Sequence, residues 1–245
     1  MTAKKRVVIC WSDISGYMAA CWRALVARGQ WDVHVVAWKR SHDTEFAAGV
    51  MDGIPCTLLT DEQREDRAHV RSIVTGMQPD VVVLPGWMSR AYMALAREPA
   101  LAGARFVMTS DNPWWGRVRQ YAARYGLRAY LRRMDRIFVP GERAWQYALR
   151  LGFGPDRIRR GLYGVDVEGL APLLEQRRAG PWPRSFLYVG RYAEIKGLDV
   201  LVQAYRAYRA QVDAPWALQC CGKGPLESLL ADEPGINNHR FVQPG

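Results

Sequence analysis

The chain has 245 residues, of which 49% are hydrophobic, and this suits one large or two modest α/β domains with a substantial core. Its apolar runs stay well short of the roughly 18 residues of a membrane-spanning helix, which excludes an integral membrane protein. The five scattered cysteines and the absence of an export signal after the basic start favour a cytoplasmic protein, with peripheral attachment to a membrane left open.

The first part of the chain alternates between strand and helix patterns. It opens with a buried-type strand at 6–11, followed by a helix at 17–28 that Gly29 ends. The following runs are predicted strands at 31–38, 54–59, 80–84, 105–109 and 136–139, and predicted helices near 61–76, 88–98, 115–133 and 141–151. Such alternation predicts a parallel sheet with helices on both faces.

A break in composition at 176–183 predicts a linker, because two prolines and a glycine interrupt any periodic element there. We therefore expect one domain at 1–180 and a second at 184–245. In the second domain the pattern predicts strands at 185–189, 216–221 and 240–243, and helices at 198–211 and 226–230. A doubly wound nucleotide-binding domain has about six strands, so we expect this one to be incomplete.

The net charge of +10 lies in the first domain, because residues 185–245 hold six Lys and Arg against six Asp and Glu. Seven arginines fall within 115–136, against one aspartate. On a single helix, Arg117, Arg124 and Arg128 would share one face, which predicts contact with an anionic membrane surface or a lipid phosphate. A merely solvated face is the alternative, and nucleic acid is not expected, since no nucleic-acid motif is present.

The loop 109–115 follows a predicted strand and should lie at the carboxyl edge of the sheet, where open α/β sheets bind ligands. Asp111 could there hydrogen-bond a sugar hydroxyl or orient an acceptor. Alternatively, Asp111 or Asn112 could cap a helix that begins after Pro113. Both interpretations remain open from the sequence.

The most informative motif is the segment 186–197, in which a strand runs into Gly190 and Arg191, and Lys196 and Gly197 then open a helix. The motif puts a guanidinium and an ammonium group beside a helix N-terminus, whose free N–H groups favour anions. Arginine can bind two phosphate oxygens through its planar fork. We therefore expect a diphosphate at Arg191 and Lys196.

This motif, the segment 216–226 and the segment 240–245 together resemble the successive blocks of family 4 glycosyltransferases, in order and spacing, across some 60 residues. The resemblance implies a GT-B-like architecture with two Rossmann-like domains, the first binding the acceptor and the second the nucleotide-sugar donor. It also implies that Arg191 and Lys196 hold the donor diphosphate, and that backbone near Val242 approaches the base.

The resemblance extends to several loop residues. Gly16 matches a family glycine that faces the donor across the interdomain cleft, although Ser15 replaces the first glycine of the usual pair. Gly222 and Gly224 could let backbone approach the donor, or could form an ordinary turn. They are not a dinucleotide fingerprint, because Glu227 stands where the third glycine belongs.

The resemblance implies an enzyme that moves a sugar from a nucleotide diphosphate to a glycan or lipid-linked acceptor hydroxyl, with retention of configuration. No metal is expected, because the four histidines lack metal spacing, and the donor is a substrate rather than a cofactor. The alternatives are a nucleotide-sugar epimerase of the same fold and a non-catalytic protein that binds nucleotide sugars or membrane surfaces. By the same resemblance, the present chain alone is expected to be inactive.

Overall fold

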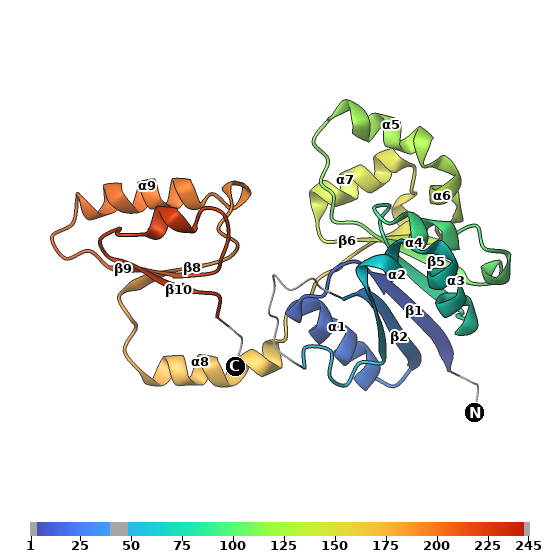
Figure 1. The fold of residues 1–245 in the computed structure, drawn as a ribbon, viewed down its shortest axis with the longest axis horizontal. Helices are drawn as coiled ribbons and strands as arrows, with labels where there is room; N and C mark the ends of the chain where they lie inside the picture. The colour runs from blue at the N-terminus through green and yellow to red at the C-terminus, as the bar shows by residue number, and fades with distance from the viewer. Residues whose placement is uncertain (1–3, 40–48, 243–245) are drawn as a thin grey trace. The chain divides into compact units, whose positions relative to one another are not determined.

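A computed structural model describes residues 4–39 and 49–242 of the chain. The chain divides into two compact units, residues 1–167 and 168–245 (Figure 1). The sequence placed the boundary at 180–184 instead. The difference arises because residues 167–179 form a helix, which the sequence pattern did not reveal and which belongs almost entirely to the second unit.

The first unit is built on a sheet of seven parallel strands in the order β3-β2-β1-β4-β5-β6-β7. The strands are β1 (Lys5–Trp11), β2 (Trp31–Trp38), β3 (Cys56–Leu59), β4 (Val81–Pro85), β5 (Arg105–Thr109), β6 (Arg136–Val139) and β7 (Ile158–Arg160). The predicted α/β architecture with a parallel sheet is confirmed. The sequence missed only β7, whose three residues include two exposed arginines and so carry no apolar run.

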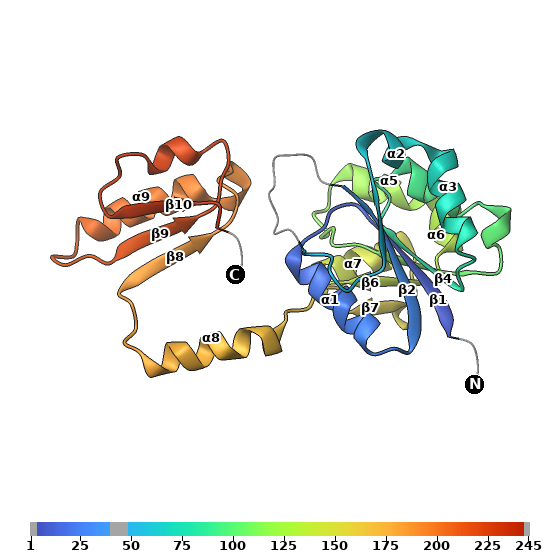
Figure 2. The ribbon, with the colours of Figure 1, turned by 60° about the horizontal axis from the view of Figure 1, so that its bottom comes forward.

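Helices connect these strands and cover both faces of the sheet (Figure 2). They are α1 (Gly16–Ala27), α2 (Asp61–Glu65), α3 (Arg67–Gly76), α4 (Arg90–Leu95), α5 (Val118–Gly126), α6 (Arg128–Arg133) and α7 (Glu142–Leu151). Alternation along β1 divides the core in two: Val7 and Ile9 pack in one cluster with α1, whereas Val8 and Cys10 join the other with α3, α4, α6 and α7.

Two predicted helices are each divided in two. The predicted helix 61–76 is α2 and α3, separated at Asp66, whose backbone is extended. Asp66 caps α3, because its carboxylate accepts from the N–H groups of Ala68 and His69. The predicted helix 115–133 is α5 and α6, separated at Leu127, and Arg117 lies before α5 with extended backbone. The prediction of one continuous helix that carries Arg117, Arg124 and Arg128 on one face is therefore wrong.

The second unit holds a three-stranded parallel sheet in the order β10-β9-β8. Its elements are α8 (Val167–Ala179), β8 (Ser185–Val189), α9 (Leu198–Arg209), β9 (Ala217–Cys221) and β10 (Ile236–Arg240), with short 3₁₀ turns at Glu194–Lys196 and Glu227–Leu230. Its core, which includes Tyr192, Leu198, Val202 and Leu218, lies between the sheet and α9.

Two predictions for this unit are corrected. The first residues of the expected linker 176–183 are the last turn of α8, which accommodates Pro172 in its interior. The last strand is Ile236–Arg240 rather than 240–243. The sequence pattern missed its position because four of its five residues are polar, so the strand has no apolar run. Gln243 lies outside the described residues. The second unit is thus α/β with a parallel sheet, as predicted, but with a shifted final strand.

Candidate functional site

Three loops of the first unit follow the carboxyl ends of parallel strands and therefore lie at one edge of its sheet. They are the residues after β1, which lead to Gly16, the residues after β5, which include Asp111, and the residues after β7, which include Tyr163. This edge is where open α/β sheets bind their ligands. Sequence reasoning placed Gly16 and Asp111 here.

Asp111 and Tyr163 are in direct contact. The Tyr163 hydroxyl donates a hydrogen bond of 3.0 Å to a carboxylate oxygen of Asp111. The ring of Tyr163 also packs edge-on against Tyr17 in α1, with ring centroids 5.4 Å apart. Tyr163 therefore connects the loop after β5 to the first turn of α1.

The electrostatics of this pair keep the phenol neutral. Partial burial and the neighbouring Asp111 carboxylate raise the pKa of Tyr163 well above its ordinary value, because a phenolate beside a carboxylate would be repelled. Tyr163 therefore acts as a hydrogen-bond donor that fixes the Asp111 carboxylate. Asp111 itself is exposed, and its other oxygen can accept from a bound hydroxyl group.

Gly16 opens helix α1 and is accessible. A Cβ built on Gly16 would meet nothing within 4 Å. Ser15 does not cap the helix with its side chain, and the first turn of α1 contains no acidic residue. This helix end therefore has neither a side-chain cap from Ser15 nor an acidic residue in its first turn, which favours an anionic ligand there.

The loop from Asp111 to Arg117 is not a helix cap. Helix α5 begins at Val118, so neither Asp111 nor Asn112 caps it, and that alternative is excluded. The buried Gln120 organises the loop instead. Its side chain accepts from the backbone of Trp115 and Arg117 and donates to the Pro113 carbonyl. No sequence pattern indicates this role for Gln120, because a glutamine side chain in a helix is usually exposed.

Arg191 and Lys196 lie in one loop of the second unit, between the carboxyl end of β8 and the start of α9. Both side chains are exposed, and neither forms an ion pair or hydrogen bond with any residue that the structure describes. A hydrogen bond to the loop backbone fixes the loop: the Tyr188 hydroxyl group donates to the Arg191 carbonyl oxygen at 2.9 Å. One loop thus presents two cations, and neither is ion-paired to Glu194 of the same loop or to another described carboxylate.

Gly222 and Gly224 pack against this same loop. A Cβ on Gly222 would lie 1.9 Å from the Gly190 carbonyl oxygen, and one on Gly224 would lie 2.4 Å from the Tyr192 carbonyl oxygen. Both glycines therefore allow the loop after β9 to approach the loop after β8. This packing accounts for the glycines, and their contact with a donor stays a prediction.

Val242 follows β10 and is exposed, at the same carboxyl edge of the small sheet. Nearby, the Tyr192 hydroxyl donates to the Asn238 side chain at 3.0 Å, which ties β10 to the loop after β8. Burial raises the pKa of Tyr192 above its ordinary range, so this phenol is a neutral donor. Arg191, Lys196, Gly222, Gly224 and Val242 therefore all lie in loops at one edge of the second sheet.

Among residues 4–39 and 49–242, no three His, Cys, Asp or Glu side chains are grouped so that they could hold a metal ion. His34 contacts the Thr57 hydroxyl and His239 contacts Gln219, whereas His42 lies outside the described residues. None of the helices in the described part of the chain is both long and apolar enough to cross a bilayer.

The fold and these loops define a chain of the GT-B class, with a Rossmann-like unit followed by a smaller parallel α/β unit. Residues 14–163 match the family described as "Glycosyl transferase 4-like domain". The match covers more than half of the chain and includes Gly16, Asp111 and Tyr163. The chain belongs to this family. No curated protein gives a significant match.

Solved structures share the fold at low sequence identity. Anabaena HepE in complex with UDP is 12% identical, with a TM-score of 0.62 over 97% of this chain and 69% of HepE. The UDP-GlcNAc 2-epimerase from Neisseria meningitidis, bound to UDP-GlcNAc, is 13% identical, with a TM-score of 0.60 over 98% of this chain and 72% of the epimerase. An alpha-glucosyltransferase in complex with UDP and DNA is 12% identical, with a TM-score of 0.58 over 89% of this chain. The chain spans 56% of that enzyme's length.

Proposed function

We propose that this chain supplies the acceptor unit and part of the donor unit of a glycosyltransferase that uses a nucleotide-diphosphate sugar, retains the configuration of the transferred sugar and needs no metal. The observation that carries the proposal is the pair of unpartnered cations, Arg191 and Lys196, in the loop between β8 and α9. Membership of the glycosyl transferase 4-like family and a fold shared with structures that contain UDP support it.

In this proposal Arg191 and Lys196 stabilise the leaving diphosphate, where negative charge develops as the glycosidic bond breaks. The N-terminal end of α1, near Gly16, adds a second anion-binding element. Asp111, oriented by Tyr163, accepts a hydrogen bond from a hydroxyl group of the sugar or the acceptor. The bond between the anomeric carbon and the diphosphate oxygen breaks, and the acceptor oxygen bonds to that carbon on the same face. The proton of the acceptor hydroxyl group passes to the released diphosphate.

The test is the affinity for UDP and GDP. Arg191→Ala and Lys196→Ala should each weaken binding by about tenfold or more, because each removes a charge-assisted contact worth about 1.5–3 kcal/mol. Isothermal titration calorimetry measures the change. Arg184→Ala is the matched control, because Arg184 is an exposed arginine directly before β8, at the opposite end of that strand. Unchanged affinity in both site variants would remove the donor-site assignment.

A membrane-bound or lipid-linked acceptor is the second part of the proposal. Residues 115–136 carry seven arginines and one aspartate, and Arg117, Arg124 and Arg128 are all exposed although they do not share one helix face. Basic residues near an anionic surface each contribute about 1 kcal/mol, and salt screens the effect.

Replacement of Arg117, Arg124 and Arg128 together with Gln should abolish co-sedimentation with anionic vesicles at low salt. Neutral vesicles are the control, to which neither protein should bind. If the triple variant pellets with anionic vesicles as well as the unchanged protein, the arginines are only solvated.

A nucleotide-sugar epimerase is the alternative enzyme, since its fold is shared with the UDP-GlcNAc 2-epimerases among the solved structures. Product analysis with a labelled nucleotide sugar separates the two functions. Label on a new acceptor supports a transferase, an altered sugar without transfer supports an epimerase, and binding without either product supports a non-catalytic protein.

A further inference from the structure

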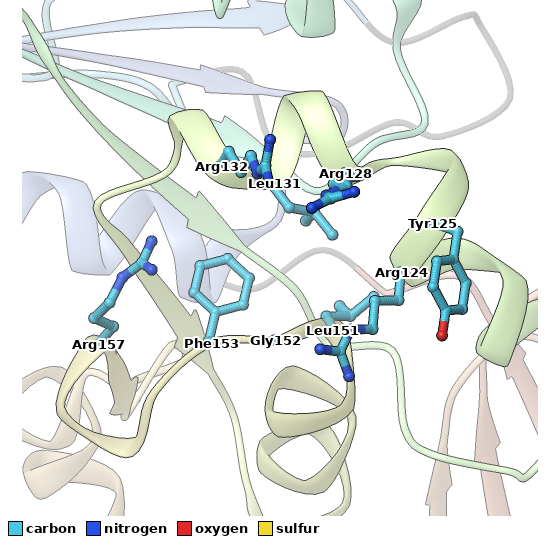
Figure 3. A pocket seen from close by; sticks show the side chains of 9 residues that line it. All are labelled: Arg124, Tyr125, Arg128, Leu131, Arg132, Leu151, Gly152, Phe153 and Arg157. Carbon is cyan, nitrogen blue, oxygen red and sulfur yellow. The ribbon is translucent and has the colours of Figure 1, made fainter.

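A cavity of about 370 Å³ lies in the first unit, between α5, α6 and the turn that follows α7 (Figure 3). We call it the arginine pocket. It is lined by Arg124, Tyr125, Arg128, Leu131, Arg132, Leu151, Gly152, Phe153 and Arg157. Four of these nine residues are arginines and none is acidic, so the pocket concentrates positive charge around a partly apolar floor.

Three of the arginines have no protein partner. Arg124, Arg128 and Arg132 are exposed, and they form no hydrogen bond or ion pair with any residue in the described part of the chain. Arg128 and Arg132 lie four residues apart in α6, where like charges on a helix repel, and Arg124 of α5 lines the same pocket. This arrangement costs folding energy that no protein carboxylate offsets, and it favours a bound anion.

The fourth arginine is fixed in place. The Nε of Arg157 donates to the Asp135 carbonyl at 3.1 Å, and a terminal nitrogen donates to the Met134 carbonyl. The guanidinium group also lies over the ring of Phe153, with 5.1 Å between its carbon and the ring centroid. Because these partners are neutral, the charge of Arg157 remains available to a ligand.

The neighbouring carboxylate of Asp135 is already engaged. It pairs with Arg105 at 2.7 Å and accepts from the N–H group of Phe106 at 2.8 Å. In addition, Gly152 ends α7 with a φ of 99°, which favours glycine, and the Nε of Arg124 lies 3.8 Å from where its Cβ would be. Gly152 therefore adds no side chain to the wall of the pocket, next to the guanidinium group of Arg124.

The arginine pocket lies at the edge of the sheet opposite the candidate substrate loops. Helix α6 ends just before β6 begins at Arg136, and the turn after α7 leads to the start of β7 at Ile158. Asp111 and Tyr163, by contrast, follow the ends of β5 and β7. The pocket is thus separate from the site at which Asp111 would contact a substrate.

We propose that the arginine pocket binds a phosphate group with at least two negative charges, such as a phosphate monoester or a diphosphate. Its volume of about 370 Å³ is within the range of small-ligand sites, about 300–1,000 Å³, and is enough for a diphosphate. Arginine forks suit phosphate oxygens, and four of them can share two phosphate groups. This inference does not depend on the glycosyltransferase assignment.

The experiment measures the binding of inorganic pyrophosphate by calorimetry, in a chain that also carries Arg191→Ala and Lys196→Ala, so that the donor loop does not contribute. In that background, Arg128→Gln with Arg132→Gln should weaken pyrophosphate binding about a hundredfold, through loss of two charge-assisted contacts. The matched control is Arg97→Gln with Arg119→Gln, which removes the same charge from exposed arginines of the first unit outside the pocket. The control should bind as the parent does.

Absence of pyrophosphate binding in the parent, or an equal loss in both double variants, would overturn the proposal. Vesicles that contain phosphatidic acid identify the source of the phosphate. If the pocket takes a lipid headgroup, the parent pellets with these vesicles, pyrophosphate releases it and the pocket variant stays in solution. If the pocket takes a free anion, pyrophosphate binds and vesicles do not. Circular dichroism confirms that every variant is folded.

Discussion

Asp111 is held by a residue that lies far from it in sequence. Tyr163 follows β7, whereas Asp111 follows β5, and the two meet because both strands end at the same edge of the sheet. The hydrogen bond orients one carboxylate oxygen and leaves the other exposed. Tyr163 therefore has the geometry of a positioning residue for the proposed contact between Asp111 and a hydroxyl group.

Replacement of Tyr163 with Phe should lower the free energy of unfolding at pH 7 by about 1 kcal/mol, the value of a hydrogen bond at a partly exposed position. The folded protein raises the pKa of Tyr163, so it favours the neutral phenol. This stabilisation is complete below pH about 10, the pKa of a free tyrosine, and is lost as the pH rises through the higher pKa of the folded state.

Urea unfolding at pH 7 and pH 11 should therefore show a smaller advantage of the unchanged protein over Tyr163→Phe at pH 11. Tyr17→Phe is the control, because Tyr17 contacts Tyr163 through its ring and its hydroxyl group has no hydrogen-bond partner among the described residues. Equal free energies of unfolding for Tyr163→Phe and the unchanged protein at pH 7 would mean that the hydrogen bond to Asp111 does not stabilise the fold.

At the scale of elements, the donor loops depend on how β8 and β9 end. The loop after β9 packs so closely on the loop after β8 that Gly222 has no room for a side chain. Backbone hydrogen bonds join the two loops, from Tyr192 to the Lys223 carbonyl and from Leu226 to the Tyr192 carbonyl, each 3.0 Å long. The position of Arg191 is thus set by a second strand as well as its own.

Gly222→Ala should destabilise the second unit by about 1–3 kcal/mol, because the obstacle is backbone that cannot move aside as a side chain would. It should also weaken UDP binding, since the loop that carries Arg191 would be displaced. Urea unfolding and calorimetry measure the two effects.

Gly16→Ala, at the start of α1 in the first unit, is the control for the substitution itself. A Cβ at Gly16 meets nothing within 4 Å, so unfolding should change by less than about 1 kcal/mol. If Gly222→Ala unfolds at the same urea concentration as the unchanged protein, the close approach of the two loops does not hold in solution.

For the whole molecule, the two units differ in how completely their cores are closed. The first unit has two buried clusters, one on each face of a seven-stranded sheet. The second has one cluster, and the side chains of Leu187 and Val189 on β8 are 68% and 72% exposed. Strand β10 is an edge strand of the three-stranded sheet and leaves backbone groups unpaired there.

Residues 1–167 should therefore fold alone. The fragment should show a cooperative thermal transition and a near-ultraviolet circular dichroism signal from its buried Trp22 and other fixed aromatic side chains. Residues 168–245 alone should show a broader transition at lower temperature. A fragment 1–167 without a cooperative transition would mean that its two clusters need the second unit.

The sequence by itself determined the alternation of strands and helices, the parallel sheets and the loop that carries Arg191 and Lys196. These follow from local patterns, because apolar periodicity and turn residues act within a few positions of the chain. It misplaced β10 and missed β7, since short polar strands have no apolar run. It also joined α5 to α6, although Gly126, the last residue of α5, is of a type at which helices commonly end.

Only the tertiary structure decided which distant residues meet. The contact between Asp111 and Tyr163 follows from the order of strands in the sheet, which no local pattern encodes. Arg157 joins Arg124, Arg128 and Arg132 around one pocket because the turn after α7 packs beside α6. The sequence predicted a basic face on one helix. In the structure the arginines line a pocket instead, because residues from separate elements come together only when those elements pack.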